Sequence, residues 1–215
     1  EGEGRALGQL GSVLERQGRY QEALECFRGA LARSEQTADL RSVGVSLNNI
    51  GVVHERQGEH ADALRHYHRA VEVLRELGDR RGEARILSNL GTLYGSLERH
   101  DEARAQLEQS LTIAREMGDR RGEAGCLNDL GAVCRALGAP REALARHRDA
   151  WKIAGEYAEA YEQARAADGI ACSHAELGDL DAAREHWERA LRLHTRMDTP
   201  EAGAIGVRLR ELDLP

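Results

Sequence analysis

The chain has 215 residues, of which 31% are charged and only 4% aromatic, and its formal net charge is -7. This negative balance argues against nucleic acid as the direct partner of the chain, because phosphate binding needs a basic surface. The four cysteines show no paired spacing, no apolar run is long enough for a membrane span and no signal peptide is visible, so we expect a reduced, cytoplasmic protein.

The chain repeats itself at a step of forty residues. The stretch Gly-Asp-Arg-Arg-Gly-Glu-Ala at 78–84 returns at 118–124, and Leu-Gly or Ile-Gly recurs in register from 10–11 to 130–131. Repetition at a fixed step indicates a stack of like units that bury their cores against one another. We therefore predict a single solenoid domain over 1–215, with repeats at about 1–38, 39–78, 79–118, 119–158 and 159–198 and a cap within 199–215.

Each repeat is predicted to be two helices separated by a turn, and a last helix is expected near 201–212, which gives eleven helices and no strands. In the third repeat Leu87, Leu90, Gly91 and Tyr94 lie at the spacing of one helical face. Glycine inside a helix costs about 1 kcal/mol against alanine, so its recurrence needs a reason. We attribute it to a close approach between Gly91 and Ala103 of the second helix. That second helix is expected to bury Ala103, Leu107, Ser110 and Leu111.

The helix ends also follow the repeat. Glycines at 58, 138 and 178 are expected to adopt the left-handed conformation that ends the first helix. The second helix should end near Gly78 or Gly118, where the following Asp79 or Asp119 can cap the next helix. Glu83 and Glu123 then fall in a first helical turn, where the helix dipole favours an acid.

The pattern resembles the tetratricopeptide repeat (TPR), and the residues of the first repeat match it well: Leu7, Leu10, Gly11, Leu14, Gly18, Arg19, Tyr20, Ala23, Phe27 and Ala30. The forty-residue unit and the missing proline after the second helix depart from the common 34-residue form. The resemblance implies an all-α solenoid, a right-handed superhelix of antiparallel helix pairs. It extends to spindle-orientation adaptors of the Leu-Gly-Asn type, to kinesin light chains and to the C-terminal TPR arrays of bacterial multidomain regulators. The last group includes Streptomyces antibiotic regulatory proteins (SARPs) and signalling ATPases.

In TPR proteins the first helices line the concave wall, where partner segments usually bind. The resemblance therefore implies a partner-binding row on this wall, made of Asn48, Asn49, Arg85, Ser88, Asn89, Thr92, Asn128, Asp129 and Arg165. The asparagines are informative because Asn is a poor helix former and its amide can pair with a peptide backbone. The alternative interpretation is that these amides only bond across neighbouring first helices and hold the stack together.

The other groups of residues with chemical potential do not predict a catalytic, metal or phosphate site. The basic position of a chaperone-tail carboxylate clamp is absent, and the junction arginines Arg80, Arg81, Arg120 and Arg121 are interpreted as solubilising. His66 and His68 are two residues apart on a helix, so they face different ways. We therefore predict no metal site shared by these two histidines and His60. A Cys134–His174 nucleophile would need a base at hydrogen-bond distance and an oxyanion site, and no glycine-rich phosphate loop occurs. We expect no enzyme, no cofactor and no metal.

The sequence thus predicts a protein- or peptide-binding module. The resemblance implies that it serves as the sensory or regulatory interaction domain of a bacterial transcriptional regulator. The chain lacks an initiator methionine and opens within a repeat, so it is expected to be a fragment of a larger protein. The alternatives are a free-standing scaffold or peptide adaptor and a pheromone-type peptide receptor. Partners would be proteins or peptides, possibly other domains of the same chain, with no nucleic acid or membrane.

Overall fold

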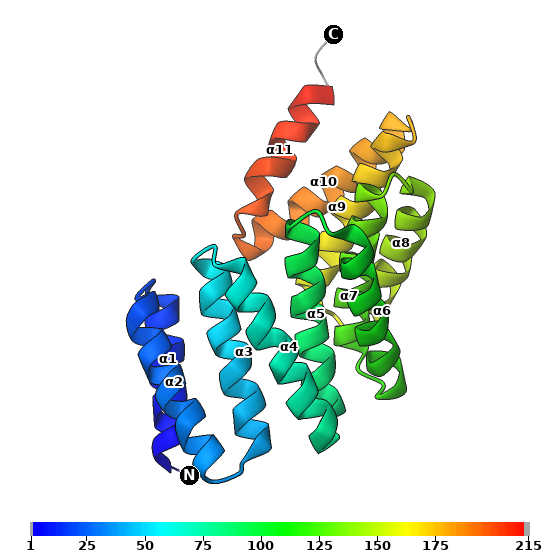
Figure 1. The fold of residues 1–215 in the computed structure, drawn as a ribbon. Coiled ribbons are helices and arrows are strands. Elements are labelled where there is room, and N and C mark those ends of the chain that lie inside the picture. The colour runs from blue at the N-terminus through cyan, green and yellow to red at the C-terminus, as the bar shows by residue number, and fades with distance from the viewer. Residues whose placement is uncertain (1, 213–215) are drawn as a thin grey trace. The chain divides into compact units, whose positions relative to one another are not determined.

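The computed structural model describes residues 2–212, and within this range the chain forms eleven α-helices and no strand (Figure 1). The all-α TPR-type fold predicted from the repeat is confirmed. The helices are α1 (Gly2–Arg16), α2 (Tyr20–Gln36), α3 (Leu40–Arg56), α4 (His60–Leu77), α5 (Arg80–Ser96), α6 (His100–Glu116), α7 (Arg120–Ala136), α8 (Pro140–Glu156), α9 (Ala160–Glu176), α10 (Leu180–Met197) and α11 (Glu201–Leu212).

The helices fall into two compact units, which we call unit 1 and unit 2. Unit 1 ends at Glu98 and holds α1 to α5, and unit 2 begins at Arg99 and holds α6 to α11. Each unit is built from antiparallel neighbours along the chain (Figure 1). A single domain and a right-handed superhelix over 1–215 stay predictions.

In unit 1, α1 pairs with α2, α3 pairs with α4, and α5 packs on α4 and α3. The repeated glycines of the first helices face an aromatic ring of the second helix. A Cβ atom added to Gly51 would lie 2.6 Å from the ring of Tyr67, and one added to Gly11 would lie 2.7 Å from the ring of Phe27. Both rings are buried. The recurrence of glycine is therefore explained by close approach, but at these two positions the neighbour is a ring and not the small alanine that we expected. The pair Gly91 and Ala103 spans the two units and stays a prediction.

In unit 2, α7 pairs with α8 and α9 pairs with α10, while α6 packs on α7 and α11 on α10. His147 takes the place of the aromatic ring here, and added Cβ atoms on Gly131 and Gly169 would lie 2.5 and 2.3 Å from it. The imidazole is thus enclosed between α7 and α9. Ser110, Leu107 and Leu111 of α6 are buried with Ala103, as the repeat predicted.

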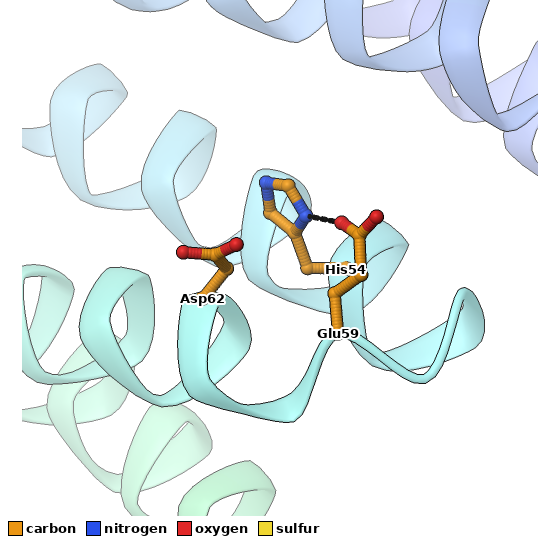
Figure 2. A group of neighbouring side chains, drawn as sticks. All are labelled: His54, Glu59 and Asp62. Atoms are coloured by element: carbon orange, nitrogen blue, oxygen red, sulfur yellow. Dashed lines mark hydrogen bonds and ion pairs between the residues drawn. The ribbon is translucent and has the colours of Figure 1, made fainter.

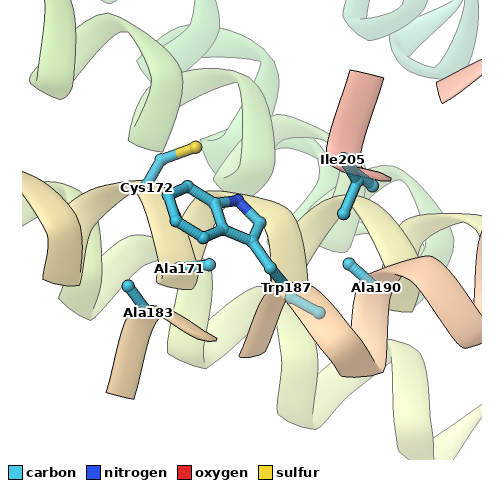
Figure 3. Close-up of a cluster of buried hydrophobic side chains, with 7 residues drawn as sticks. Ala171, Cys172, Ala183, Trp187, Ala190 and Ile205 are labelled. Carbon is cyan, nitrogen blue, oxygen red and sulfur yellow. The ribbon is translucent and has the colours of Figure 1, made fainter. Parts of the chain in front are cut away.

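The terminal helix α11 covers a core cluster at the end of unit 2. Ile205 is buried beside Trp187, Ala171 and Ala190 (Figure 3). Leu209 and Leu212, which the sequence placed on the same side of this helix, pack partly buried against the cluster. The predicted capping helix near 201–212 is confirmed, and Ile205, Leu209 and Leu212 are the side chains that it packs on this cluster.

The turns confirm the predicted helix ends. Gly58, Gly138 and Gly178 have φ angles of 77°, 72° and 82°, and Glu98 adopts φ 59° at the same position of the third repeat without being glycine. At the junctions, the Asp79 side chain accepts a hydrogen bond from the Gly82 backbone N–H at 3.1 Å, and Asp119 accepts one from Gly122 at 3.0 Å. The predicted capping by the Asp of each junction is confirmed.

The junction glutamates are in the first helical turn, as predicted, but the dipole is only part of their environment. Glu83 is 2% exposed and accepts hydrogen bonds from Arg75 at 2.9 Å and Arg80 at 2.7 Å. Glu123 repeats this arrangement with Arg115 and Arg120. Arg80 and Arg120 are therefore ion-paired to a buried carboxylate, and their interpretation as solubilising side chains was incomplete.

Candidate partner-binding surface

The predicted partner-binding row divides between the two units, and six of its residues lie in unit 1. Asn48 and Asn49 are on α3, while Arg85, Ser88, Asn89 and Thr92 are on α5. The four positions on α5 are spaced i, i+3, i+4 and i+7, so they share one face of the helix. Because α3 and α5 are in contact, this face of α5 and the Asn pair of α3 lie together. We call these six residues the unit 1 row.

Two asparagines of the unit 1 row bond across neighbouring first helices. The Asn89 amide donates a hydrogen bond to the Asn48 side-chain oxygen at 2.9 Å, and the Asn48 amide donates one to Asn49 at 3.3 Å. Asn48 is buried, whereas Asn49 and Asn89 are half-buried. The bracing role that the sequence left open is therefore observed for the Asn48–Asn89 pair.

The remaining groups of the unit 1 row have no partner among the described residues. Arg85 is exposed and makes no ion pair there, and the hydroxyl of half-buried Ser88 makes no hydrogen bond there. The Asn49 amide accepts from Asn48 but donates to no described group. Thr92 is different, because its hydroxyl donates to the Ser88 backbone carbonyl at 3.1 Å. One guanidinium, one hydroxyl and one amide NH2 group are thus available to a ligand.

The row in unit 2, made of Asn128, Asp129 and Arg165, is fully engaged within the protein. Asn128 is 2% exposed, and its amide donates to the backbone carbonyl of Glu162 at 3.0 Å and to the Glu162 carboxylate at 2.9 Å. Its side-chain oxygen lies 3.3 Å from Nδ1 of His147. Every hydrogen-bonding atom of this amide group has a partner on α8 or α9.

Asp129 and Arg165 form an ion pair between α7 and α9. The Arg165 guanidinium is 2.5 Å from Asp129 and 3.1 Å from Glu162, which lies one turn before it on α9. Burial raises the pKa of Asp129 above its usual range, although the Arg165 charge opposes the shift. Burial also acts to lower the pKa of Arg165, but the Asp129 and Glu162 carboxylates outweigh it and raise that pKa. The shift of Asp129 follows from its burial, and that of Arg165 follows from its two carboxylate partners.

The same network explains the state of the buried imidazole. His147 is 3% exposed, and burial, followed by the charges of Arg135 and Arg165, lowers its pKa to about 4. The side chain is therefore neutral at pH 7. Its Nδ1 faces the Asn128 oxygen, so this nitrogen carries the proton and donates.

Sequence reasoning missed Glu162 and His147 as members of this network. A signal was present for Glu162, since it occupies the position of junction glycines Gly82 and Gly122 in the fifth repeat. His147 stands in the column of Phe27 and Tyr67, and nothing in its sequence position shows that an amide oxygen faces it. The partner role of the nine predicted residues stays a prediction.

The structure does not bring His66 and His68 to one shared site, nor Cys134 and His174. His66 Nδ1 bonds the Asp62 backbone carbonyl at 2.8 Å, whereas His68 Nε2 bonds the Tyr94 hydroxyl at 2.8 Å. Cys134 lies 3.5 Å from the Arg104 guanidinium, and burial raises the pKa of its thiol. His174 pairs instead with Asp179 at 3.2 Å. Within residues 2–212, no helix is long and apolar enough to cross a membrane.

Comparison with solved structures shows the same fold in proteins of low sequence identity. A STAND signal transduction ATPase with a tetratricopeptide repeat sensor from Pyrococcus horikoshii is 16% identical with a TM-score of 0.83, over 98% of this chain and 33% of that one. The apo form of RapI is 15% identical with a TM-score of 0.82, over 91% and 72% of the two chains. BtubC from P. vanneervenii is 19% identical with a TM-score of 0.80, over 89% and 80%.

No curated protein sequence matches the chain significantly. Family models described as tetratricopeptide repeat match residues 2–76 and 42–116, and another of the same description matches residues 163–197. The first model alone spans 2–116, which is more than half of the 215 residues. Together with the helix pairs and the repeated glycine-to-ring contacts, these matches show that the chain belongs to the tetratricopeptide repeat family.

Proposed function

We propose that this chain binds a protein or peptide through the unit 1 row. TPR domains are protein-interaction modules, and the observation that carries the proposal here is the set of unpaired polar groups on α3 and α5. Arg85, Ser88 and the Asn49 amide have no partner among the described residues, although their neighbours in the row are hydrogen-bonded. Polar groups at this position of two adjacent first helices suit an extended segment lying across them.

The chemistry of these groups favours a peptide that carries an acidic side chain. A guanidinium can hold a carboxylate through two parallel hydrogen bonds, and such charge-assisted bonds are stronger than neutral ones. The Asn49 amide and the Ser88 hydroxyl can then bond the peptide backbone without regard to its side chains. Arg85 would supply specificity, and the two neutral groups would supply register.

The finer proposal is that this module is the sensory or regulatory domain of a bacterial cytoplasmic transcriptional regulator. It rests on the resemblance of the repeat to SARP-type and signalling-ATPase arrays and is supported by the likeness to the TPR sensor of the STAND protein, of which this chain covers 33%. An upstream DNA-binding or ATPase domain in the full gene would support it. A gene encoding only TPR repeats would favour the adaptor or the pheromone-type receptor instead.

The binding proposal can be tested without knowing the natural partner. A random peptide library would be panned against the immobilised protein, and one enriched peptide titrated against the wild type and three variants. Arg85→Leu is expected to weaken binding about 10-fold or more, because one charge-assisted hydrogen bond contributes about 1.5–3 kcal/mol. Ser88→Ala should weaken it less. Arg65→Leu is the matched control, since Arg65 is an exposed arginine of the same unit outside the row.

Equal binding by Arg85→Leu, Ser88→Ala and the wild type would contradict the proposed surface. Thermal melts of all variants establish that any loss of affinity arises in a folded protein.

A further inference from the structure

The turn between α3 and α4 gathers three side chains that can each ligate a metal ion. His54 is in the last turn of α3, Glu59 precedes α4, and Asp62 is in the first turn of α4. One possible ligand atom from each lies within 4.8 Å of the other two. Figure 2 shows the imidazole between the two carboxylates, with Nδ1 of His54 2.5 Å from the Glu59 oxygen.

The imidazole of His54 is the buried member of the group, and it is only half satisfied. His54 is 5% exposed, and its Nε2 atom has no hydrogen-bond partner among the described residues. Its ring packs against that of His66, with 5.2 Å between the centroids and an angle of 21°. The other nitrogen, Nδ1, faces Glu59, so Nδ1 is the atom that an ion shared by His54 and Glu59 would use (Figure 2).

The backbone holds the histidine and the glutamate in place. The Glu59 N–H bonds the His54 carbonyl at 2.9 Å across the left-handed turn at Gly58. The two carboxylates are partly exposed, with 47% of the Glu59 side chain and 40% of the Asp62 side chain accessible. They can therefore move toward an ion while the buried imidazole stays fixed.

We propose that His54, Glu59 and Asp62 form a binding site for a divalent transition metal ion of the zinc class. One imidazole nitrogen and two carboxylate oxygens suit Zn²⁺ and related ions, whereas Mg²⁺ and Ca²⁺ prefer oxygen ligands alone. Zinc is bound by such atoms at about 2.0–2.2 Å, so ligand atoms in a tetrahedral site lie roughly 3.4 Å apart. Rotation of the two exposed carboxylates provides the needed approach, and water completes the coordination.

Two existing interactions must give way. Asp62 is paired with Arg65 at 2.7 Å, but the Arg65 side chain is 71% exposed, and such surface pairs are weak. The hydrogen bond between His54 and Glu59 must also rearrange, because a ligating imidazole nitrogen cannot carry a proton. Metal affinity should therefore fall as the pH is lowered.

The fifth repeat provides a natural control inside the same chain. Its turn carries His174 and Asp179 at 3.2 Å, and the ring of His186 stacks on His174 with centroids 6.0 Å apart. Two features differ from the turn in unit 1. Ala182 stands at the position of Asp62, and the Arg148 guanidinium lies 3.4 Å from Nε2 of His174, where its charge would repel a cation.

The experiment is a calorimetric titration of the tag-free protein with ZnCl2. All samples carry Cys26→Ser, because Cys26 is the only one of the four cysteines that is not buried. We expect one zinc equivalent, no binding of Mg²⁺, and at least about a 10-fold loss of zinc affinity in Asp62→Ala and His54→Gln. His174→Gln should leave the titration unchanged.

Asp62→Ala carries the test if His54→Gln is unstable, since Asp62 is half-exposed and its removal leaves no buried group unpaired. The proposal is overturned if zinc does not bind saturably, if Asp62→Ala binds zinc as the parent does, or if His174→Gln causes the same loss. Binding of Mg²⁺ with equal affinity would also overturn the assignment to the zinc class.

Discussion

The polar rows of the two units occupy the same positions of the repeat and do different things. Asn48 and Asn128 are equivalent, as are Arg85 and Arg165, since each pair is separated by two steps of forty residues. In unit 2 the asparagine and the arginine are bound to Glu162, Asp129 and His147. In unit 1 the asparagines bond one another, and Arg85 has no ionic partner among the described residues.

The difference shows that a repeat position does not determine the role of its residue. Arg165 braces α9 against α7 because positions 129 and 162 are acidic. The equivalent positions in unit 1 are Asn49 and Gly82, and neither residue carries a charge. A cation without a local acid is open to one from a partner. We therefore expect substitutions in the unit 2 row to change stability, and those of Arg85, Ser88 and Asn49 in the unit 1 row to change binding.

The largest difference in stability is expected between variants of the two equivalent arginines, Arg165 and Arg85. Arg165→Leu leaves the shielded Asp129 carboxylate without its counter-ion and should lower the free energy of unfolding by about 2–3 kcal/mol. This is less than the roughly 3–5 kcal/mol of a fully buried pair, because 31% of the Arg165 side chain is exposed. Arg85→Leu should change stability by no more than about 0.5 kcal/mol. Urea denaturation of both variants measures this, and equal losses would refute the contrast.

The second prediction concerns pH. The pKa of His147 is about 4 in the folded protein and rises to its ordinary value of about 6.5 on unfolding, so below pH 6.5 the unfolded chain binds the extra proton. The stabilisation is complete above pH 6.5 and is lost as the pH falls toward 4. Between pH 7 and pH 5 it should amount to roughly 2 kcal/mol.

The variant His147→Phe isolates this contribution, because it places at the site the ring found at Phe27 and removes the titrating group. Its free energy of unfolding should depend less steeply on pH than that of the wild type. The lowered pKa values of His66 and His186 act in the same direction in both proteins and cancel in the difference. Parallel pH profiles would show that His147 is not the group responsible.

The smallest difference in stability is expected between variants of the asparagine side chains Asn128 and Asn49. Asn128→Ala leaves the Glu162 carbonyl and the His147 N–H without their partner and should cost about 1–2 kcal/mol of stability. Asn49→Ala removes a half-buried amide that donates to no described group, so its stability should stay within about 0.5 kcal/mol of the wild type. Melting curves of the two variants at pH 7 make the comparison. A larger loss for Asn49→Ala would show that Asn49 also braces unit 1 and is not open to a partner.

The local structure of this protein was determined by its sequence. Helix faces such as Leu87, Leu90 and Tyr94 follow from apolar spacing alone, and the left-handed glycines and capping aspartates follow from the backbone chemistry of residues next to them. Such features depend on neighbours within one or two turns, so periodicity and turn residues are sufficient to predict them.

Only the tertiary structure decided which side chains are paired. Asn48 meets Asn89, Asp129 meets Arg165 and Asn128 meets Glu162, each across 34 to 41 residues of sequence. The ring that faces Gly51 and the approach of Asp62 to His54 likewise depend on how two helices pack. The repeat specifies that neighbouring helices will touch. Whether a polar group on such a face is bonded or open depends on the one or two residues that packing places opposite it, and the repeat pattern leaves those positions variable.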